Sequence, residues 1–164
     1  MKFNYNIAKF TKRLKFKRNY AKLKRVFNRN DNSGRLIPVN ELTRGIGKTT
    51  ILIKRVLKEN NSVMVVKHRS TKKHISLLIA HEALKNKKIF TDWGYKEIPS
   101  IYTYDELLLL DNKIRLLLSV YIDESMNSEE ILLLKSLGVH IKNGFIYCNS
   151  VRSPLEFKGR DINE

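Results

Sequence analysis

Hydrophobic residues in this chain form two kinds of pattern, which together predict alternating strands and helices. Short apolar runs occur at 63–66, 116–122 and 144–148, as expected for strands buried on both faces of a sheet. Four stretches without Gly or Pro are predicted as helices: 49–58, 70–84, 104–111 and 128–137. Alternation of this kind indicates an α/β fold, with a mostly parallel central sheet between two layers of helices.

Local signatures refine some of these elements. Thr103-x-x-Glu106 and Asn127-x-x-Glu130 match the capping box that starts a helix, and Gly138 predicts where the second of these helices ends. A short added strand is expected at 98–102, after a basic excursion at 85–96. The expected buried face of helix 70–84 consists of Ile75, Leu78, Ile79 and Ala83.

The first 30 residues are predicted to form a basic amphipathic helix. Their apolar residues follow a 4-3-4 helical spacing, with Lys and Arg on the other faces. The two sets are Phe3, Ile7, Phe10 and Leu14, then Phe16, Tyr20, Leu23 and Phe27. We therefore expect a basic helical N-terminal arm at 1–30, a linker at 31–35 and one domain at 36–164.

Charge is concentrated in this arm. The chain has a formal net charge of +16, and residues 1–35 hold 12 Lys and Arg but one acid, Asp31. Such a helix can bind nucleic-acid phosphates, lie on an anionic membrane, or pack its apolar stripe on the domain. We favour nucleic acid and expect no membrane partner, since no apolar stretch reaches membrane-spanning length. A single cysteine and the lack of a secretory leader favour a cytoplasmic or virion-associated protein.

The first candidate site is Thr43-Arg44-Gly45-Ile46-Gly47-Lys48-Thr49-Thr50. Glycines let the backbone turn so that several N–H groups face one anion, Lys48 can approach the β- and γ-phosphates, and Thr49 can bind Mg²⁺. The helix expected from Thr49 would place its positive end under the phosphates. The alternative is an ordinary glycine turn before a surface helix, because Leu42 stands where the phosphate-loop pattern has its first Gly.

The second candidate site lies at the ends of two later strands. Asp123 and Glu124 follow the apolar run 116–122, so Asp123 can support Mg²⁺ and Glu124 can polarise water. These acids are also favoured at a helix N-terminus, which is the alternative. Asn149 follows the strand 144–148 and can sense the γ-phosphate; as an alternative it forms a turn or a helix cap.

These segments resemble the P-loop NTPase domain of phage terminase large subunits and related DNA-packaging and helicase-like motors. The resemblance spans roughly 36–157 and includes 43–50, 63–70, 121–124 and 148–150. It implies a three-layer P-loop fold, ATP and Mg²⁺ as cofactors, Arg44 on the γ-phosphate and Asn149 as the coupling residue. Because 164 residues leave no room for a nuclease domain, we expect a stand-alone motor or a diverged relative rather than a complete terminase.

The sequence thus predicts an ATPase acting on nucleic acid, with double-stranded DNA as the expected partner. Besides those of the arm, the basic residues expected to contact DNA are Lys67, Arg69, Lys72 and Lys73. A homo-oligomeric ring is possible in this class, with Arg152 or Arg160 reaching a neighbouring nucleotide. The rival prediction is a non-catalytic nucleic-acid-binding or virion structural protein with a vestigial phosphate loop. A small-molecule kinase is disfavoured, because 85–102 shows no clear Arg-rich lid.

Overall fold

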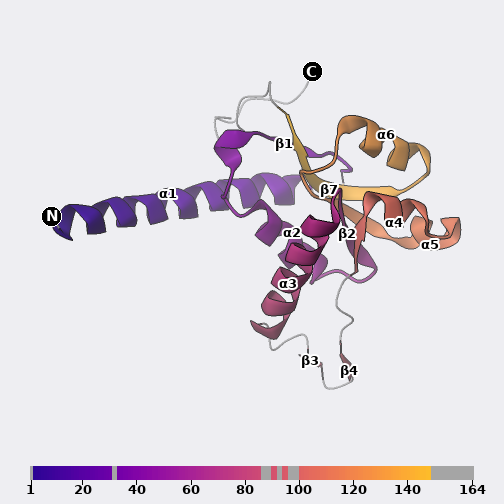
Figure 1. Ribbon diagram of the computed structural model, residues 1–164, viewed down its shortest axis with the longest axis horizontal. Coiled ribbons are helices and arrows are strands. Elements are labelled where there is room, and N and C mark those ends of the chain that lie inside the picture. Colours follow the sequence, from indigo (N-terminus) through magenta and orange to yellow (C-terminus); the bar gives the residue numbers. More distant parts are fainter. Residues whose placement is uncertain (1, 31–32, 86–89, 92–93, 96–99, 149–164) are drawn as a thin grey trace.

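The computed structural model describes residues 2–30, 33–85, 90–91, 94–95 and 100–148 (Figure 1). The side chains of 2–11, 42, 84–85, 90–91 and 94–95 lie outside that description. The elements, in chain order, are α1 Lys2–Arg29, β1 Ile37–Val39, the 3-10 turn η1 Glu41–Thr43, α2 Lys48–Val56, β2 Ser62–Val66, α3 Arg69–Lys85, β3 Phe90–Thr91, β4 Gly94–Tyr95, β5 Ile101–Thr103, α4 Tyr104–Leu108, α5 Asn112–Leu117, β6 Ser119–Ile122, α6 Ser128–Ser136 and β7 His140–Tyr147.

The sheet has five strands, all parallel, in the order β1-β7-β6-β2-β5. Ile37 of β1 lies opposite Phe145 of β7, and Met64 of β2 lies opposite Tyr121 of β6. The short strands β3 and β4 pair antiparallel outside this sheet. The predicted α/β fold with a mostly parallel sheet is therefore confirmed.

Two hydrophobic cores lie on opposite faces of the sheet. Met64 and Tyr121 belong to one core, with residues of α1, α2 and α3. Val65 and Ile122, their neighbours along β2 and β6, belong to the other, with residues of α4 and α6. Since side chains alternate between the faces of a strand, apolar residues at successive positions require helices on both faces. The molecule accordingly has three layers (Figure 1).

Strand β1 is short and lies at the edge of the described sheet. It spans only 37–39, and among the described strands it pairs with β7 alone. The carbonyl of Val39 accepts a hydrogen bond of 2.8 Å from the Cys148 N–H, so the backbone of Pro38 faces away from β7. A proline that lacks an N–H is compatible with that outward position on an edge strand.

The segment 104–122 differs from the prediction. Helix 104–111 ends at Leu108, and Asp111 then caps a second helix, α5, by accepting a hydrogen bond of 2.8 Å from the Lys113 N–H. Leu116 and Leu117 are helical and exposed rather than part of a strand. The prediction of a single strand over the apolar run 116–122 was therefore wrong. Hydrophobicity alone does not separate the end of a helix from the start of a strand.

The helix ends marked by local signatures are confirmed. Both capping boxes form, with reciprocal hydrogen bonds at Thr103–Glu106 and Asn127–Glu130. Gly138 ends α6 with φ 76°, a conformation that glycine adopts without strain. On α3, the residues Ile75, Ile79 and Ala83 are buried as predicted, whereas Leu78 is 37% exposed and was wrongly placed on the buried face.

Helix α1 is a single helix whose C-terminal half is part of the core. Leu23 and Phe27 are fully buried, and the Phe27 ring centroid lies 5.6 Å from that of Phe145. The buried amide of Asn143 donates a hydrogen bond of 2.9 Å to the Phe27 carbonyl. The rest of α1 projects from the domain (Figure 1). None of the described helices has the length and apolarity that a bilayer span requires.

Candidate functional site

The predicted site segments gather at one edge of the sheet. All five strands are parallel, so the loops that follow β1, β6 and β2 emerge at their common carboxyl edge. The loop after β1 leads into α2 at Lys48, and Asp123 directly follows β6. Strand β7 lies between β1 and β6, so one strand separates the loop from the carboxylates in the sheet order.

The loop before α2 exposes backbone donors. Gly45 has φ 71° and Gly47 has φ 91°, both in the left-handed region. Within the described residues, no hydrogen bond engages the backbone N–H groups of Gly45, Ile46 or Gly47, and no side chain caps α2. Free N–H groups before the positive end of a helix are a suitable place for an anion.

Lys48 joins this loop to the carboxylates. Its side chain is buried, and its Nζ donates a hydrogen bond of 2.7 Å to the Thr43 carbonyl. The same Nζ lies 3.0 Å from Oε2 of Glu124, whose side chain is 37% exposed. An ammonium group between loop and carboxylate places one positive charge at the centre of the site.

Thr43 and Ile46 position the loop. The buried Thr43 hydroxyl donates to the Asn40 carbonyl at 2.6 Å and accepts from the Asn40 N–H at 3.2 Å. Thr43 therefore offers Lys48 its carbonyl while its hydroxyl closes the turn. Ile46 is buried in the core, Thr49 is half-buried and Thr50 is exposed. The contribution of Asn40 was missed, because a single polar residue two positions after a proline gives no distinctive sequence signal.

Arg44 forms an exposed ion pair with Glu41. Its side chain is 84% exposed and its guanidinium lies 3.5 Å from the carboxylate of Glu41, three residues earlier. Glu41 also accepts a hydrogen bond of 3.3 Å from the Tyr147 hydroxyl at the end of β7. A role for Arg44 at the γ-phosphate requires its side chain to leave this exposed pair.

Asp123 is the most perturbed carboxylate of the site. It is 6% exposed, and burial together with the negative charge of Glu124 raises its pKa from 3.8 to about 6. Hydrogen bonds from the Glu124 N–H and the Ser125 hydroxyl, and the charge of Lys48, act in the opposite direction. Ser125 also accepts a hydrogen bond of 3.0 Å from the Lys67 N–H, which fixes this turn against the end of β2.

The donor set fits Mg²⁺ held jointly with phosphates. Mg²⁺ prefers oxygen ligands and is commonly bound by one or two carboxylates, waters and the substrate phosphates. Asp123 offers a carboxylate that is costly to keep charged in a buried position, and a cation would relieve that cost. The described residues contain no cluster of three or more His, Cys, Asp or Glu that could hold a metal without phosphates. Asp123 would therefore hold the ion, with the half-buried Thr49 next to Lys48 as the second predicted ligand.

The remaining predicted residues fall into two groups. Asn149, Arg152 and Arg160 lie outside the described residues. Of the four bases after β2, Lys67 pairs with Glu130 at 2.9 Å and Lys72 pairs with Glu106, whereas Arg69 and Lys73 are exposed. Carboxylates thus already neutralise two of the four bases that were expected to contact DNA.

Aromatic residues of α1 lie against the loop, which sequence reasoning missed. A Cβ atom on Gly47 would lie 2.8 Å from Cδ2 of Tyr20 and 3.9 Å from Cζ of Phe16. The two rings stack, with centroids 6.2 Å apart and an interplanar angle of 16°. Their helical spacing was visible in the sequence, but nothing in it indicated which surface the stripe meets.

Comparison of the chain with protein-family models, with curated proteins and with solved structures finds no match.

Proposed function

We propose that this chain is a P-loop ATPase that binds ATP and Mg²⁺ at the carboxyl edge of the sheet and acts on nucleic acid. Its expected role is DNA packaging or translocation. We expect the protein to be encoded by a phage or another mobile element, and to act in the host cytoplasm or in association with virions. A homo-oligomeric ring is part of this proposal, with Arg152 or Arg160 as candidate residues for reaching a neighbouring nucleotide.

The distance of 3.0 Å between Lys48 Nζ and Glu124 Oε2 is the observation on which the proposal rests. Lys48 is the first residue of α2, at the end of the loop after β1, and Glu124 lies in the turn after β6, with β7 between the two strands. That order agrees with the additional-strand type of P-loop ATPase, which the resemblance to terminases implies. A γ-phosphate bound by Lys48 would lie next to Glu124, where a carboxylate can orient the attacking water.

The proposed roles follow from this geometry. The N–H groups of Gly45 to Gly47 and the start of α2 would bind the phosphates, with Lys48 neutralising charge on the β- and γ-phosphates. Asp123 and Thr49 would hold Mg²⁺, which supplies further neutralisation of phosphate charge when bound. Glu124 would orient water, Arg44 would stabilise the γ-phosphate and Asn149 would couple hydrolysis to movement.

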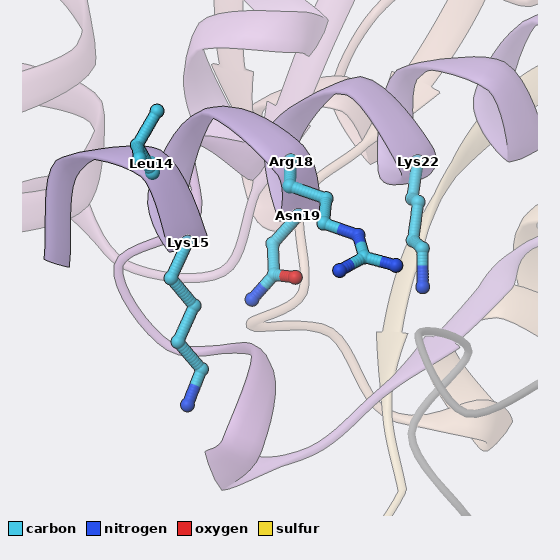
Figure 2. A pocket seen from close by; sticks show the side chains of 5 residues that line it. All are labelled: Leu14, Lys15, Arg18, Asn19 and Lys22. Atoms are coloured by element: carbon cyan, nitrogen blue, oxygen red, sulfur yellow. The ribbon is translucent and has the colours of Figure 1, made fainter. Parts of the chain in front are cut away.

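The nucleic-acid part of the proposal rests on one face of α1, which we call the basic stripe. It consists of Lys15, Arg18, Lys22, Arg25 and Arg29, all of which are exposed. Their 3-4-3-4 spacing places them opposite the apolar stripe 16, 20, 23 and 27, which faces the domain. Figure 2 shows Lys15, Arg18 and Lys22 on the same side of α1, lining a hollow with Asn19 and Leu14. The basic stripe is about 21 Å long at 1.5 Å per residue, long enough to meet several phosphates.

The basic stripe predicts a salt-dependent affinity for duplex DNA. We expect the double variant Arg18→Gln with Lys22→Gln to lower the slope of log K against log salt by about 1.8, because two phosphate contacts are lost. Fluorescence anisotropy with a labelled duplex at several salt concentrations measures the slope. Lys58→Gln with Lys135→Gln, two exposed lysines elsewhere, is the matched control for net charge. Equal slopes for both double variants would contradict the assignment of the basic stripe.

The rival is a non-catalytic nucleic-acid-binding or virion structural protein with a vestigial loop. Two observations favour it: the exposed Arg44 pairs with Glu41, and the basic stripe does not need the loop in order to bind phosphates. In this rival function the retained carboxylates have no catalytic work.

ATP hydrolysis with Mg²⁺, measured with and without double-stranded DNA, separates the two functions. We expect DNA-stimulated turnover that is lost in Lys48→Ala, because that variant removes the positive charge at the phosphates. Absent turnover, together with DNA binding that survives Lys48→Ala and weakens in the basic-stripe variant, would instead support the structural protein.

A further inference from the structure

The aromatic pair Phe16 and Tyr20 lies where α1 passes the phosphate loop. The apolar stripe of α1 has two parts with different surroundings: Leu23 and Phe27 are fully buried in the core, whereas Phe16 is 45% exposed. Tyr20 is half-buried and packs at the margin of the core. The stripe therefore continues beyond the core, and its aromatic end reaches the loop at Gly47 rather than the sheet.

The contact with Gly47 is close. A Cβ there would come within 2.8 Å of the Tyr20 ring, so the loop and α1 touch at the residue preceding Lys48. At Gly45, by contrast, a Cβ would meet no atom within 4 Å, so that side of the loop is open. The aromatic pair thus borders the proposed phosphate site on one side.

We propose that Phe16 and Tyr20 form the base-binding wall of the nucleotide site, and that the base of the bound nucleoside triphosphate stacks on Phe16. This inference rests on the proposed ATP site. A base is joined to its phosphates through a ribose, so an aromatic surface beside the phosphate loop lies within the span of one nucleotide. Stacking on an exposed ring removes apolar surface of both partners from water.

The charge around the pair suits an anionic ligand. Helix α1 contains no Asp or Glu, and the neighbouring basic residues Lys15, Lys17 and Arg18 are exposed. A base of a single-stranded nucleic acid could also stack on Phe16. We favour the nucleotide because the rings touch the phosphate loop itself, whereas the basic stripe lies on the opposite face of α1.

The test compares a ligand that has a base with one that has none. Isothermal titration calorimetry with Mg²⁺ gives the affinities of the full chain for ATP and for inorganic tripolyphosphate. Phe16→Ala should weaken ATP binding about 5- to 150-fold, the range of one base–aromatic stack, and should leave the affinity for tripolyphosphate unchanged within about twofold. Leu14→Ala is the matched control, since Leu14 is an exposed apolar residue of α1 on another face.

A second variant tests the contact directly. Phe16→Trp should keep the affinity for ATP. The unsubstituted protein contains one Trp, and the fluorescence that the second Trp adds should be quenched by ATP but not by tripolyphosphate. A ring that acts only through folding would not distinguish the two ligands.

The outcomes separate this inference from the proposed function. If the unsubstituted protein binds neither ligand, both the ATP site and the base-binding wall are overturned. If it binds ATP and tripolyphosphate equally well, or if Phe16→Ala binds ATP normally, only the base-binding wall is overturned. The base-binding wall is also overturned if Phe16→Ala weakens the binding of a single-stranded oligonucleotide and leaves ATP binding unchanged.

Discussion

Glu124→Gln is expected to lower the rate of ATP hydrolysis by about 10²- to 10⁴-fold while ATP remains bound. The amide keeps the shape of the side chain but cannot accept a proton from water. It also removes the ion pair with Lys48, whose Nζ lies 3.0 Å from the carboxylate. Because that lysine loses a competing partner, ATP affinity should be unchanged or higher. Single-turnover hydrolysis and equilibrium ATP binding, measured separately, test the two statements.

The control for this variant is Glu129→Gln. Glu129 is an exposed acid in the first turn of α6, so its replacement changes the net charge equally and leaves the carboxyl edge of the sheet untouched. Turnover in this control should stay within about twofold of the unsubstituted protein. If Glu124→Gln lost ATP binding as well as turnover, Glu124 would be a binding residue rather than the group that orients water.

The sequence predicted best those features that depend on neighbouring residues. Both capping boxes lie within four residues, so their hydrogen bonds form in any helix that starts there, and both are present. The continuous apolar character of 63–66 predicted a strand covered on both faces, and β2 is buried throughout. Such signals need no knowledge of the rest of the fold.

Features set by distant contacts were not predictable. Pro38 has no N–H to donate and does not suit a central strand, but only the fold shows that β1 lies at the edge of the described sheet. Leu116 and Leu117 resembled a strand, but Asp111 starts a helix that includes them. The need for glycine at position 144 was not predictable either. A Cβ there would lie 2.4 Å from the Ile122 carbonyl oxygen, and only the pairing of β6 with β7 brings these two residues together.

The candidate site shows both situations. Lys48 could be proposed from the glycine loop, and Asp123 and Glu124 from their place after an apolar run. The structure brings these three side chains together. Arg44, in contrast, is exposed and pairs with Glu41, which lies in the 3-10 turn just before it. The contact of Tyr20 with Gly47 joins residues 27 positions apart, and no local pattern encodes that distance.

Asp123→Asn is expected to stabilise the folded protein while it impairs Mg²⁺-dependent hydrolysis. Burial and the charge of Glu124 raise the pKa of Asp123 to about 6 from 3.8, so keeping this carboxylate charged at neutral pH costs folding free energy. A shift of about two units corresponds to roughly 3 kcal/mol. The neutral amide avoids that cost, as expected where a functional site reduces stability. Urea denaturation at pH 8 should therefore give a free energy of unfolding about 2–3 kcal/mol higher.

The pH dependence distinguishes this cause from better packing. Between about pH 4 and pH 6 the folded protein binds a proton at Asp123 that the unfolded chain does not, so this group makes stability fall as the pH rises through that window. The advantage of Asp123→Asn should therefore vanish near pH 4 and be complete above pH 7. Glu59, Glu106 and Glu130, whose pKa values are lowered, give the opposite slope in both proteins and cancel in the difference.

Asp105→Asn completes the comparison, because Asp105 is an exposed acid in the first turn of α4. Its replacement removes a charge from a helix N-terminus and should lower stability by no more than about 1 kcal/mol. An Asp123→Asn protein that is less stable than the unsubstituted one at pH 8 would mean that the carboxylate is stabilised where it lies. Asp123 would then be a structural partner of Lys48 and Ser125, and a cation at this edge of the sheet would relieve no free-energy cost of a buried charge.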